Sequence, residues 1–284
     1  MASRSSLTLA SMVIALFAAN AQAAIVAQWL LDEQGISDGT VATDTTGNWN
    51  GVYIDGSFFA TGTFTSVTGH DGIPNSAVAF NKDAFIQVDT PPDPNDPNDP
   101  GGILTNNDLG TNGWHVEFWM RPDANFFKHT VWSENRPSGA GPVLLMQTRG
   151  DIGDPNTLYL NDFIEGAKAG PPGGFQTEQW YYVAGVFDPL GTQTINIYIS
   201  DGTTIWSDTS TRTEARVISL TDRFRLNGNF VELGVALALD NFTIYDTPFD
   251  PNSELIQLFG VPEPTSLAML GLGGLLLARR RQGA

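Results

Sequence analysis

The segment His115-Val116-Glu117-Phe118-Trp119-Met120 decides the fold class, because its side chains alternate with a period of two. Successive side chains of a β-strand point to opposite faces of a sheet, whereas a helix repeats every 3.6 residues. The apolar even-numbered residues are therefore expected to face a core. The odd-numbered residues, which combine imidazole, carboxylate and indole groups, are expected on the outer face of the same strand.

The same kind of short strand recurs from residue 25 to residue 249, separated by clusters of Gly, Asn, Asp and Pro. Only residues 252–259 carry a helical pattern, for which Asp250 or Ser253 would be the cap. The sequence predicts an all-β, two-sheet antiparallel β-sandwich of jelly-roll type. Residues 93–104 and 126–142 are expected to be insertions. The clearest predicted strands are 25–31, 77–80, 85–88, 116–120, 143–147, 181–187, 194–199 and 242–245.

The N-terminus has the three parts of a secretory signal peptide. Arg4 is a positive start, residues 7–19 form an apolar stretch too short for a membrane span, and Ala21-Gln22-Ala23 is a small-x-small cleavage pattern. We expect residues 1–23 to form a signal helix that signal peptidase removes after Ala23.

The C-terminus reads as a membrane-sorting tail. Its twelve-residue apolar run, 267–278, would reach only ~18 Å as a helix, short of a ~30 Å hydrocarbon layer, so a transient anchor is expected. The arginines that follow should stay on the cytoplasmic side while the rest of the chain is exported. The residues that define the tail besides this run are Val261, Pro262, Glu263, Pro264, Arg279, Arg280 and Arg281.

Composition limits the partners of the exported domain, which we place at residues 24–258. The full chain has a formal net charge of −17, and processing removes more basic than acidic residues. A domain of this charge repels nucleic acid and anionic membranes. The chain has no cysteine, which excludes disulfides, thiolate metal sites and cysteine nucleophiles.

The order Val-Pro-Glu-Pro, apolar run and arginine cluster resembles the PEP-CTERM sorting signal of Gram-negative bacteria. The resemblance covers the tail, residues 259–284. It implies recognition by an exosortase, cleavage near Pro262 to Pro264, passage through the inner membrane, and release to the cell surface or an exopolysaccharide matrix.

Seven short motifs of the domain resemble, in the same order, those of laminin G-like, concanavalin A-like jelly-roll domains. They include the opening Gln28-Trp29-Leu30 strand, the Trp180-to-Asp188 motif and the closing strand at Asp240. The resemblance implies a concanavalin A-like β-sandwich. The matching segments are 25–33, 44–48, 77–88, 118–122, 179–188, 197–202 and 239–245.

A carbohydrate site is the first functional hypothesis. Flat aromatic faces bind a sugar ring, and a few polar groups fix its hydroxyls. The outward residues His115, Glu117, Trp119 and Tyr198 supply both kinds of group. The competing interpretation is that these side chains pack beneath loops. A glycan or a surface protein is the expected partner.

A structural calcium ion is the one cofactor that the resemblance suggests, near strand ends, with Asp240 and Asp32 as ligands. The alternative role for such an aspartate is to bond the backbone of its own turn. The repeat Asp93-Pro94-Asn95-Asp96 to Pro100 is a poorer ligand set, because its carboxylates lie ~9 Å apart in a polyproline helix.

No catalytic motif stands out. Jelly-roll glucanases carry E-x-D-x-x-E on one strand, and Glu117 has no acidic neighbour at i+2 or i+4. His70, His115 and His129 follow no metal or triad spacing. The sequence therefore favours a non-catalytic binding or adhesion module of the surface or biofilm matrix. A polysaccharide-active glucanase or lyase, or a purely structural matrix protein, is the alternative.

Overall fold

The computed structural model describes the domain from residue 23 to residue 248, apart from several connecting segments. The predicted signal helix, Ala21, the repeat at Asp93 and the whole sorting tail lie outside the described residues. The described ranges are 23–56, 62–81, 84–89, 103, 113–123, 128–135, 142–149, 154–161, 166–188, 194–211, 223–228 and 236–248.

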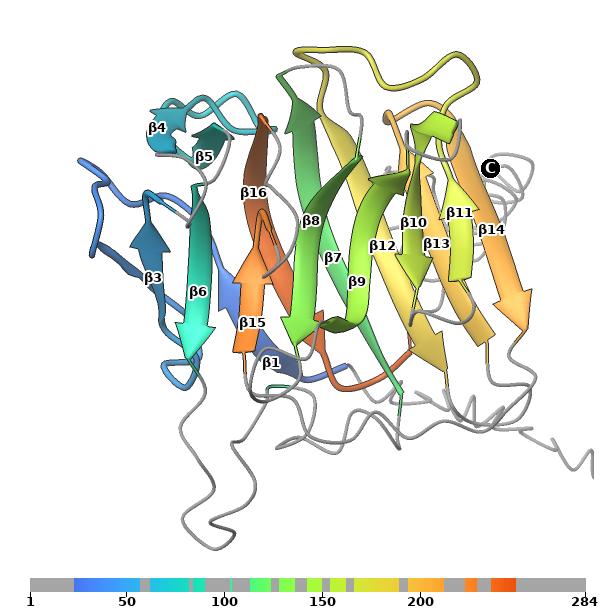
Figure 1. The fold of residues 1–284 in the computed structure, drawn as a ribbon, viewed down its shortest axis with the longest axis horizontal. Coiled ribbons are helices and arrows are strands. Elements are labelled where there is room, and N and C mark those ends of the chain that lie inside the picture. The colour runs from blue at the N-terminus through green and yellow to red at the C-terminus, as the bar shows by residue number, and fades with distance from the viewer. Residues whose placement is uncertain are drawn as a thin grey trace, which may run out of the picture.

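Two antiparallel sheets lie face to face, and this confirms the predicted β-sandwich (Figure 1). Sheet A, at the back of Figure 1, follows the order β14-β13-β12-β7-β16-β5-β4, and β1 pairs with one end of β16. Its strands are β14 (Ile205–Thr211), β13 (Thr194–Ser200), β12 (Tyr181–Asp188), β7 (Trp114–Pro122), β16 (Leu237–Tyr245), β5 (Ala77–Asn81), β4 (Thr63–Val67) and β1 (Ile25–Trp29).

Sheet B, at the front of Figure 1, follows the order β11-β10-β9-β8-β15-β6-β3-β2. The consecutive strands β8 to β11 form an antiparallel meander, as do β12 to β14 in sheet A. The strands of sheet B are β11 (Gly166–Ala169), β10 (Asp154–Asn161), β9 (Pro142–Arg149), β8 (Lys128–Asn135), β15 (Arg223–Leu226), β6 (Phe85–Asp89), β3 (Gly51–Ile54) and β2 (Val41–Ala42).

All eight strands expected from the sequence are present, with ends that differ by a few residues. The first strand ends at Trp29 rather than Leu31, because Leu31 has a φ of 62°, outside the extended region. The last strand is longer than predicted and begins at Leu237.

The prediction that residues 126–142 form an insertion is wrong. Residues 128–135 are β8, a central strand of sheet B between β15 and β9. Trp132 of this strand is 1% exposed and packs in the core. Polar residues dominate this part of the sequence, so its alternation was hidden, and pairing with two neighbours overrode the weak local signal.

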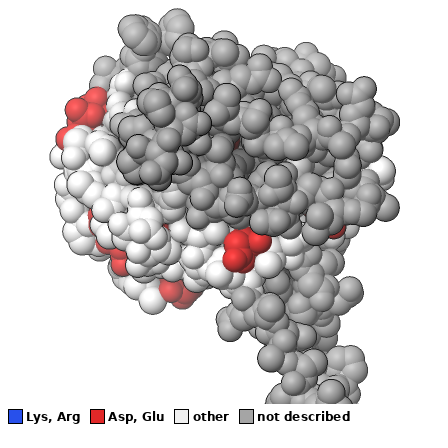
Figure 2. Space-filling view, turned by 90° about the horizontal axis from the view of Figure 1, so that it is seen from below, with Lys and Arg blue, Asp and Glu red and all other residues white. Residues whose placement is uncertain are grey.

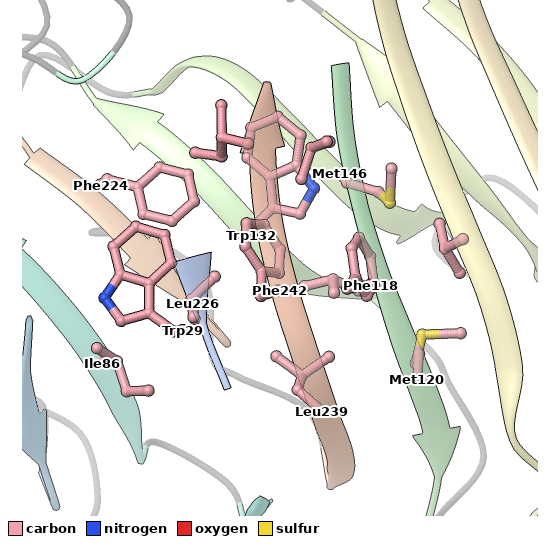
Figure 3. Close-up of a cluster of buried hydrophobic side chains, with 14 of the residues drawn as sticks. Trp29, Ile86, Phe118, Met120, Trp132, Met146, Phe224, Leu226, Leu239 and Phe242 are labelled. Carbon is pink, nitrogen blue, oxygen red and sulfur yellow. The ribbon is translucent and has the colours of Figure 1, made fainter. Parts of the chain in front are cut away.

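Aromatic side chains from both sheets meet in one continuous core (Figure 3). The Trp29 ring of sheet A stacks on Phe224 of sheet B, with centroids 5.6 Å apart and planes at 7°. Phe224 also stacks on Trp132, and Phe118 stacks on Phe242 within sheet A. These large side chains carry much of the buried area that holds the sheets together.

A β-bulge divides β16 into two parts that pair with different strands. Asp240 opposes Trp119 and Thr243 opposes Glu117, so three steps on β16 match two on β7. Asn241, the extra residue, has a φ of 52°. Before the bulge β16 pairs with β5, and after it with β1. The bulge lets Asp240 reach the outer face while Phe242 returns to the core.

The surface reflects the acidic composition. Figure 2, a view from below, shows Asp and Glu but no Lys or Arg on the described part of that face. Of the described basic side chains, Arg225 is 8% exposed and bonds Gln87 of the neighbouring strand.

Candidate functional site

The four residues predicted to bind carbohydrate lie on the outer face of sheet A. His115, Glu117 and Trp119 come from β7, and Tyr198 comes from β13. Strand β12 lies between them, and its register places Ala184 opposite both Glu117 and Tyr198. The strands thus share one sheet, and the side chains form a continuous band that we call the outer-face strip.

Glu117 is the polar centre of the outer-face strip. Its Oε2 atom accepts a hydrogen bond from the Tyr182 hydroxyl and its Oε1 atom accepts one from Tyr245, both at 2.5 Å. Tyr182 stands on β12 and Tyr245 on β16, the two strands that flank β7. The carboxylate is therefore fixed between two phenols, with both oxygens occupied by strong charge-assisted bonds.

His115 lies at one end of the strip and is fully buried. Its ring stacks on Tyr245 at a centroid distance of 4.3 Å, and Nδ1 donates to the Thr247 carbonyl at 2.6 Å. Burial lowers the pKa of His115 below its usual 6.5, against the opposing effects of this hydrogen bond and of Glu117 and Asp246. The side chain is therefore a neutral, rigid support rather than a mobile ligand-binding group.

Trp119 lies toward the other end of the outer-face strip, where its ring contacts two aromatic rings, one face-on and one edge-on. The His70 imidazole stacks on it with centroids 4.3 Å apart and planes at 9°, and Tyr182 meets it edge-on at 5.6 Å. Asp240 Oδ2 fixes His70 by accepting from the backbone N–H at 3.0 Å and from Nδ1 at 2.7 Å. The His70 side chain keeps 25% of its surface exposed.

The strip continues past Trp119 to a second tryptophan. The Arg121 guanidinium lies 5.4 Å from the centre of the Trp180 ring, a cation–π contact. Arg121 also pairs with Asp123 at 3.1 Å. Glu178, 3.9 Å from Arg121, has a φ of 64° in the left-handed region, where a non-glycine residue is strained.

Tyr198 packs in a small apolar cluster at the middle of this face. Its buried members are Tyr182, Ala184 and Val186 of β12, and Trp119 is partly buried against them. The cluster is separate from the main core. Tyr198 therefore lies on the outer face of sheet A, within an apolar cluster that the alternation of its own strand does not reveal.

Tyr182, Tyr245 and His70 hold residues of the strip in place but were not assigned to the site from the sequence. Alternation along β12 would have shown that Tyr182 faces outward beside Glu117, because Tyr181 and Val183 face the core. Alternation in the last strand likewise puts Tyr245 on the face opposite the buried Ile244, which is the outer face. No sequence signal pointed to His70, because it lies in a turn that only the tertiary fold brings to Trp119.

The two predicted calcium ligands take different places. Asp240 is 5% exposed and bonds His70, whereas Asp32 is exposed after β1, where its backbone carbonyl accepts from Gln34. Among the described residues, no three His, Cys, Asp or Glu side chains are grouped to hold a metal ion. A calcium site built on these two aspartates stays a prediction.

The described residues contain no helix long and apolar enough to cross a membrane. Ala23 lies just before β1. The predicted cleavage residue Ala21 and the sorting residues from Val261 to Arg281 fall outside the described part.

Comparison with known proteins confirms the sorting tail. Residues 260–282 match a family model described as the PEP-CTERM protein-sorting motif. The motif marks an exported protein that transits a membrane and is processed by an exosortase. No curated protein matches the chain.

Solved structures share the fold at low identity. A Trypanosoma rangeli sialidase is 12% identical, with a TM-score of 0.52 over 83% of this chain and 32% of the sialidase. A botulinum neurotoxin serotype D/C binding domain is 14% identical, with a TM-score of 0.51 over 83% of this chain and 51% of that one. Botulinum neurotoxin type C, whose cell entry depends on two ganglioside molecules, is 12% identical with a TM-score of 0.50, over 82% and 50%. The chain spans about a third to a half of the length of these proteins, and the likeness concerns the β-sandwich alone.

Proposed function

We propose that this exported protein is a non-catalytic carbohydrate-binding or adhesion module of the cell surface or exopolysaccharide matrix. The observation that carries the proposal is the outer-face strip, in which Glu117 is fixed between two tyrosine hydroxyls beside the stacked rings of Trp119 and His70. Rigid aromatic surfaces next to oriented oxygen acceptors are the features that bind sugar rings and their hydroxyls.

The charges of the strip favour a neutral glycan. Glu117, Asp240, Asp123 and Glu178 lie along it, against Arg121 as the basic side chain, and the chain as a whole carries −17. An anionic polysaccharide would meet electrostatic repulsion over this face. Two of the similar folds belong to a sialidase and to a ganglioside-dependent toxin, which supports glycan binding by analogy only.

Binding of the processed protein to neutral and anionic bacterial polysaccharides tests the proposal. Calorimetric titration should show binding to a neutral polymer, and Trp119→Ala should weaken it at least tenfold, because burial of a large apolar ring contributes ~1.5–3 kcal/mol. Tyr159→Ala is the matched control, since Tyr159 lies under Lys168 on sheet B. Equal affinities of the Trp119→Ala and Tyr159→Ala variants for the polymer would show that the outer-face strip is not the binding site.

We further propose that the module does not cleave its ligand. A general acid must deliver a proton to its ligand, but both Glu117 oxygens already accept hydrogen bonds from tyrosine hydroxyls, so neither oxygen is placed for that transfer. The other acidic group beside Trp119, Asp240, bonds His70. Prolonged incubation with the bound polysaccharide should release no reducing ends, and release that Glu117→Gln abolishes would establish an enzyme instead.

A further inference from the structure

We propose, on the premise that the outer-face strip binds carbohydrate, that the Nε2 atom of His70 accepts a hydrogen bond from a hydroxyl group of the glycan. The starting observation is that His70 belongs to an exposed turn, 170 residues from Asp240 in the sequence, yet Asp240 bonds it and its ring stacks on Trp119 at 4.3 Å. The side chain still keeps 25% of its surface exposed. A partly exposed ring is thus held firmly beside the strip.

Two bonds to one carboxylate oxygen fix the orientation of His70. Asp240 Oδ2 accepts from the backbone N–H of His70 at 3.0 Å and lies 2.7 Å from Nδ1 of the same residue. Because this oxygen acts as an acceptor, the hydrogen-bond network assigns a proton to Nδ1. The Asp240 side chain is 7% exposed, so water competes little for these bonds. The position of the ring and its tautomer are therefore set before a ligand arrives.

The second ring nitrogen, Nε2, is the one left for a ligand. No described residue bonds this atom, whereas Nδ1 is bonded to Asp240. In a neutral imidazole that carries its proton on Nδ1, Nε2 has a lone pair and acts as an acceptor. The groups of a neutral polysaccharide that can donate to it are hydroxyls. The stack on Trp119 places this acceptor at the edge of an aromatic surface, and a sugar needs both features.

The surrounding backbone has two special features that allow Asp240 to reach His70. The bulge residue Asn241, with a φ of 52°, turns Asp240 to the outer face of sheet A. In the turn, Gly69 is required, because a Cβ atom there would lie 2.5 Å from Asp240 Oδ2 and closer still to Ser76 Oγ. A left-handed residue and a glycine together place one partly exposed imidazole, as is typical of a preorganised binding site.

A purely structural role for the same contacts, in which they fasten an exposed turn to sheet A, leads to different expectations. Such a role explains the bonds to Asp240 but does not depend on Nε2. A variant without Nε2 would then lose stability, and any loss of affinity would be equal for every polysaccharide. The contact proposed for Nε2 instead requires a bare ring nitrogen and a ligand hydroxyl, and each requirement has its own measurement.

The first measurement needs no glycan. Long-range proton–nitrogen NMR correlation of the isotope-labelled, processed protein determines which ring nitrogen of each histidine carries a proton. His70→Gln identifies the His70 signals by their loss. Nδ1 of His70 should carry the proton and Nε2 should be bare, because Asp240 Oδ2 accepts from Nδ1. A proton on Nε2 would overturn the inference, whatever the protein binds.

The second measurement is calorimetric titration of the processed protein with dextran, a neutral glucan, and with O-methylated dextran, which lacks hydroxyl donors. The unaltered protein should bind dextran more tightly than the methylated polymer. His70→Asn keeps an amide donor for Asp240 but has no atom at the place of Nε2, so the ratio of the two affinities should fall by about threefold or more.

Ile73→Ala is the matched control, because Ile73 lies in the same turn and is 56% exposed. This variant should keep the affinity ratio of the unaltered protein. A ratio that His70→Asn leaves unchanged would overturn the contact with His70 while the proposed function stands. Binding of neither polymer by the unaltered protein would count against the proposed function itself, and the contact would fail with it.

Discussion

His115 is a titratable residue that the fold keeps uncharged. It is fully buried between Tyr245 and the Thr247 carbonyl, and burial lowers its pKa below 6.5. Below pH 6.5 the unfolded chain binds a proton at this position and the native chain does not. Stability is therefore complete above that pH and falls as the pH drops toward the lowered native pKa.

We predict that this linkage is measurable in chemical unfolding between pH 7 and pH 5. One unmatched proton corresponds to about 1.4 kcal/mol of unfolding free energy per pH unit. His115→Gln keeps an amide donor for Thr247 but cannot take up the proton, so its stability should fall less steeply. If the unfolding free energies of the two proteins fell equally with pH, groups other than His115 would cause the acid sensitivity.

Asp44 shows how one buried carboxylate fixes a turn. It is 2% exposed and accepts from the backbone N–H groups of Gln28, Thr46, Asn48 and Trp49, at 2.8–3.2 Å. The bond to Gln28 ties the turn to β1. The residue begins segment 44–48, one of the seven that resemble laminin G-like domains.

Asp44→Ala should lower the unfolding free energy by about 3 kcal/mol, because several buried donors lose their acceptor at once. The exposed Asp208, which accepts from the Lys168 N–H, offers a control. Asp208→Ala should cost less than about 1 kcal/mol. Urea unfolding of the two variants compares them, and equal losses would contradict the account.

At the scale of elements, the bulge in β16 connects the strip to the core. An uninterrupted alternation would place Asp240 and Phe242 on the same face. The extra residue Asn241 allows Asp240 to bond His70 outside while Phe242 stacks on Phe118 inside. Sequence alternation located the strand but not the bulge, because nothing local distinguishes an unpaired residue from a paired one.

The close approach of the two sheets depends on a glycine in β12. A Cβ atom at Gly185 would lie 2.9 Å from Leu160 Cδ2 of sheet B and 3.1 Å from Met146 Cε. Both neighbours are fully buried and can move little. The apolar strand therefore requires its smallest residue where it faces the other sheet.

Gly185→Ala should cost about 1–3 kcal/mol of unfolding free energy through overpacking. Leu160→Val removes the contacting δ-carbon, so the double variant should lose less than the sum of the single losses. Thermal unfolding of the unaltered protein, the two single variants and the double variant gives the four free energies of a double-mutant cycle. Strict additivity would mean that the two side chains do not compete for space.

At the scale of the molecule, the domain and its tail have separate tasks. The sandwich is built from a core shared by both sheets, whereas residues 260–282 match a sorting motif that acts during export. The strongly negative charge of the chain is expected to repel nucleic acid.

Replacing Pro262, Glu263 and Pro264 together by alanine should block processing, so that the precursor accumulates in the membrane fraction. The unaltered protein should be recovered outside the inner membrane, without either terminal segment. Fractionation followed by intact-mass measurement distinguishes the two forms. An alanine variant that matures normally would show that these residues are not read by the processing enzyme.

Sequence by itself determined the all-β class, the eight strands with clear alternation, the residues that share the outer face of β7 and the sorting tail. These features depend on local periodicity or on a linear motif, and the side-chain period of a strand is visible in one dimension. Only the tertiary structure decided that β8 is a central strand, that Tyr182 and Tyr245 hold Glu117, and that His70 stacks on Trp119. Those contacts join residues far apart in the chain, and their partners are fixed by strand order and by one bulge, which no short segment encodes.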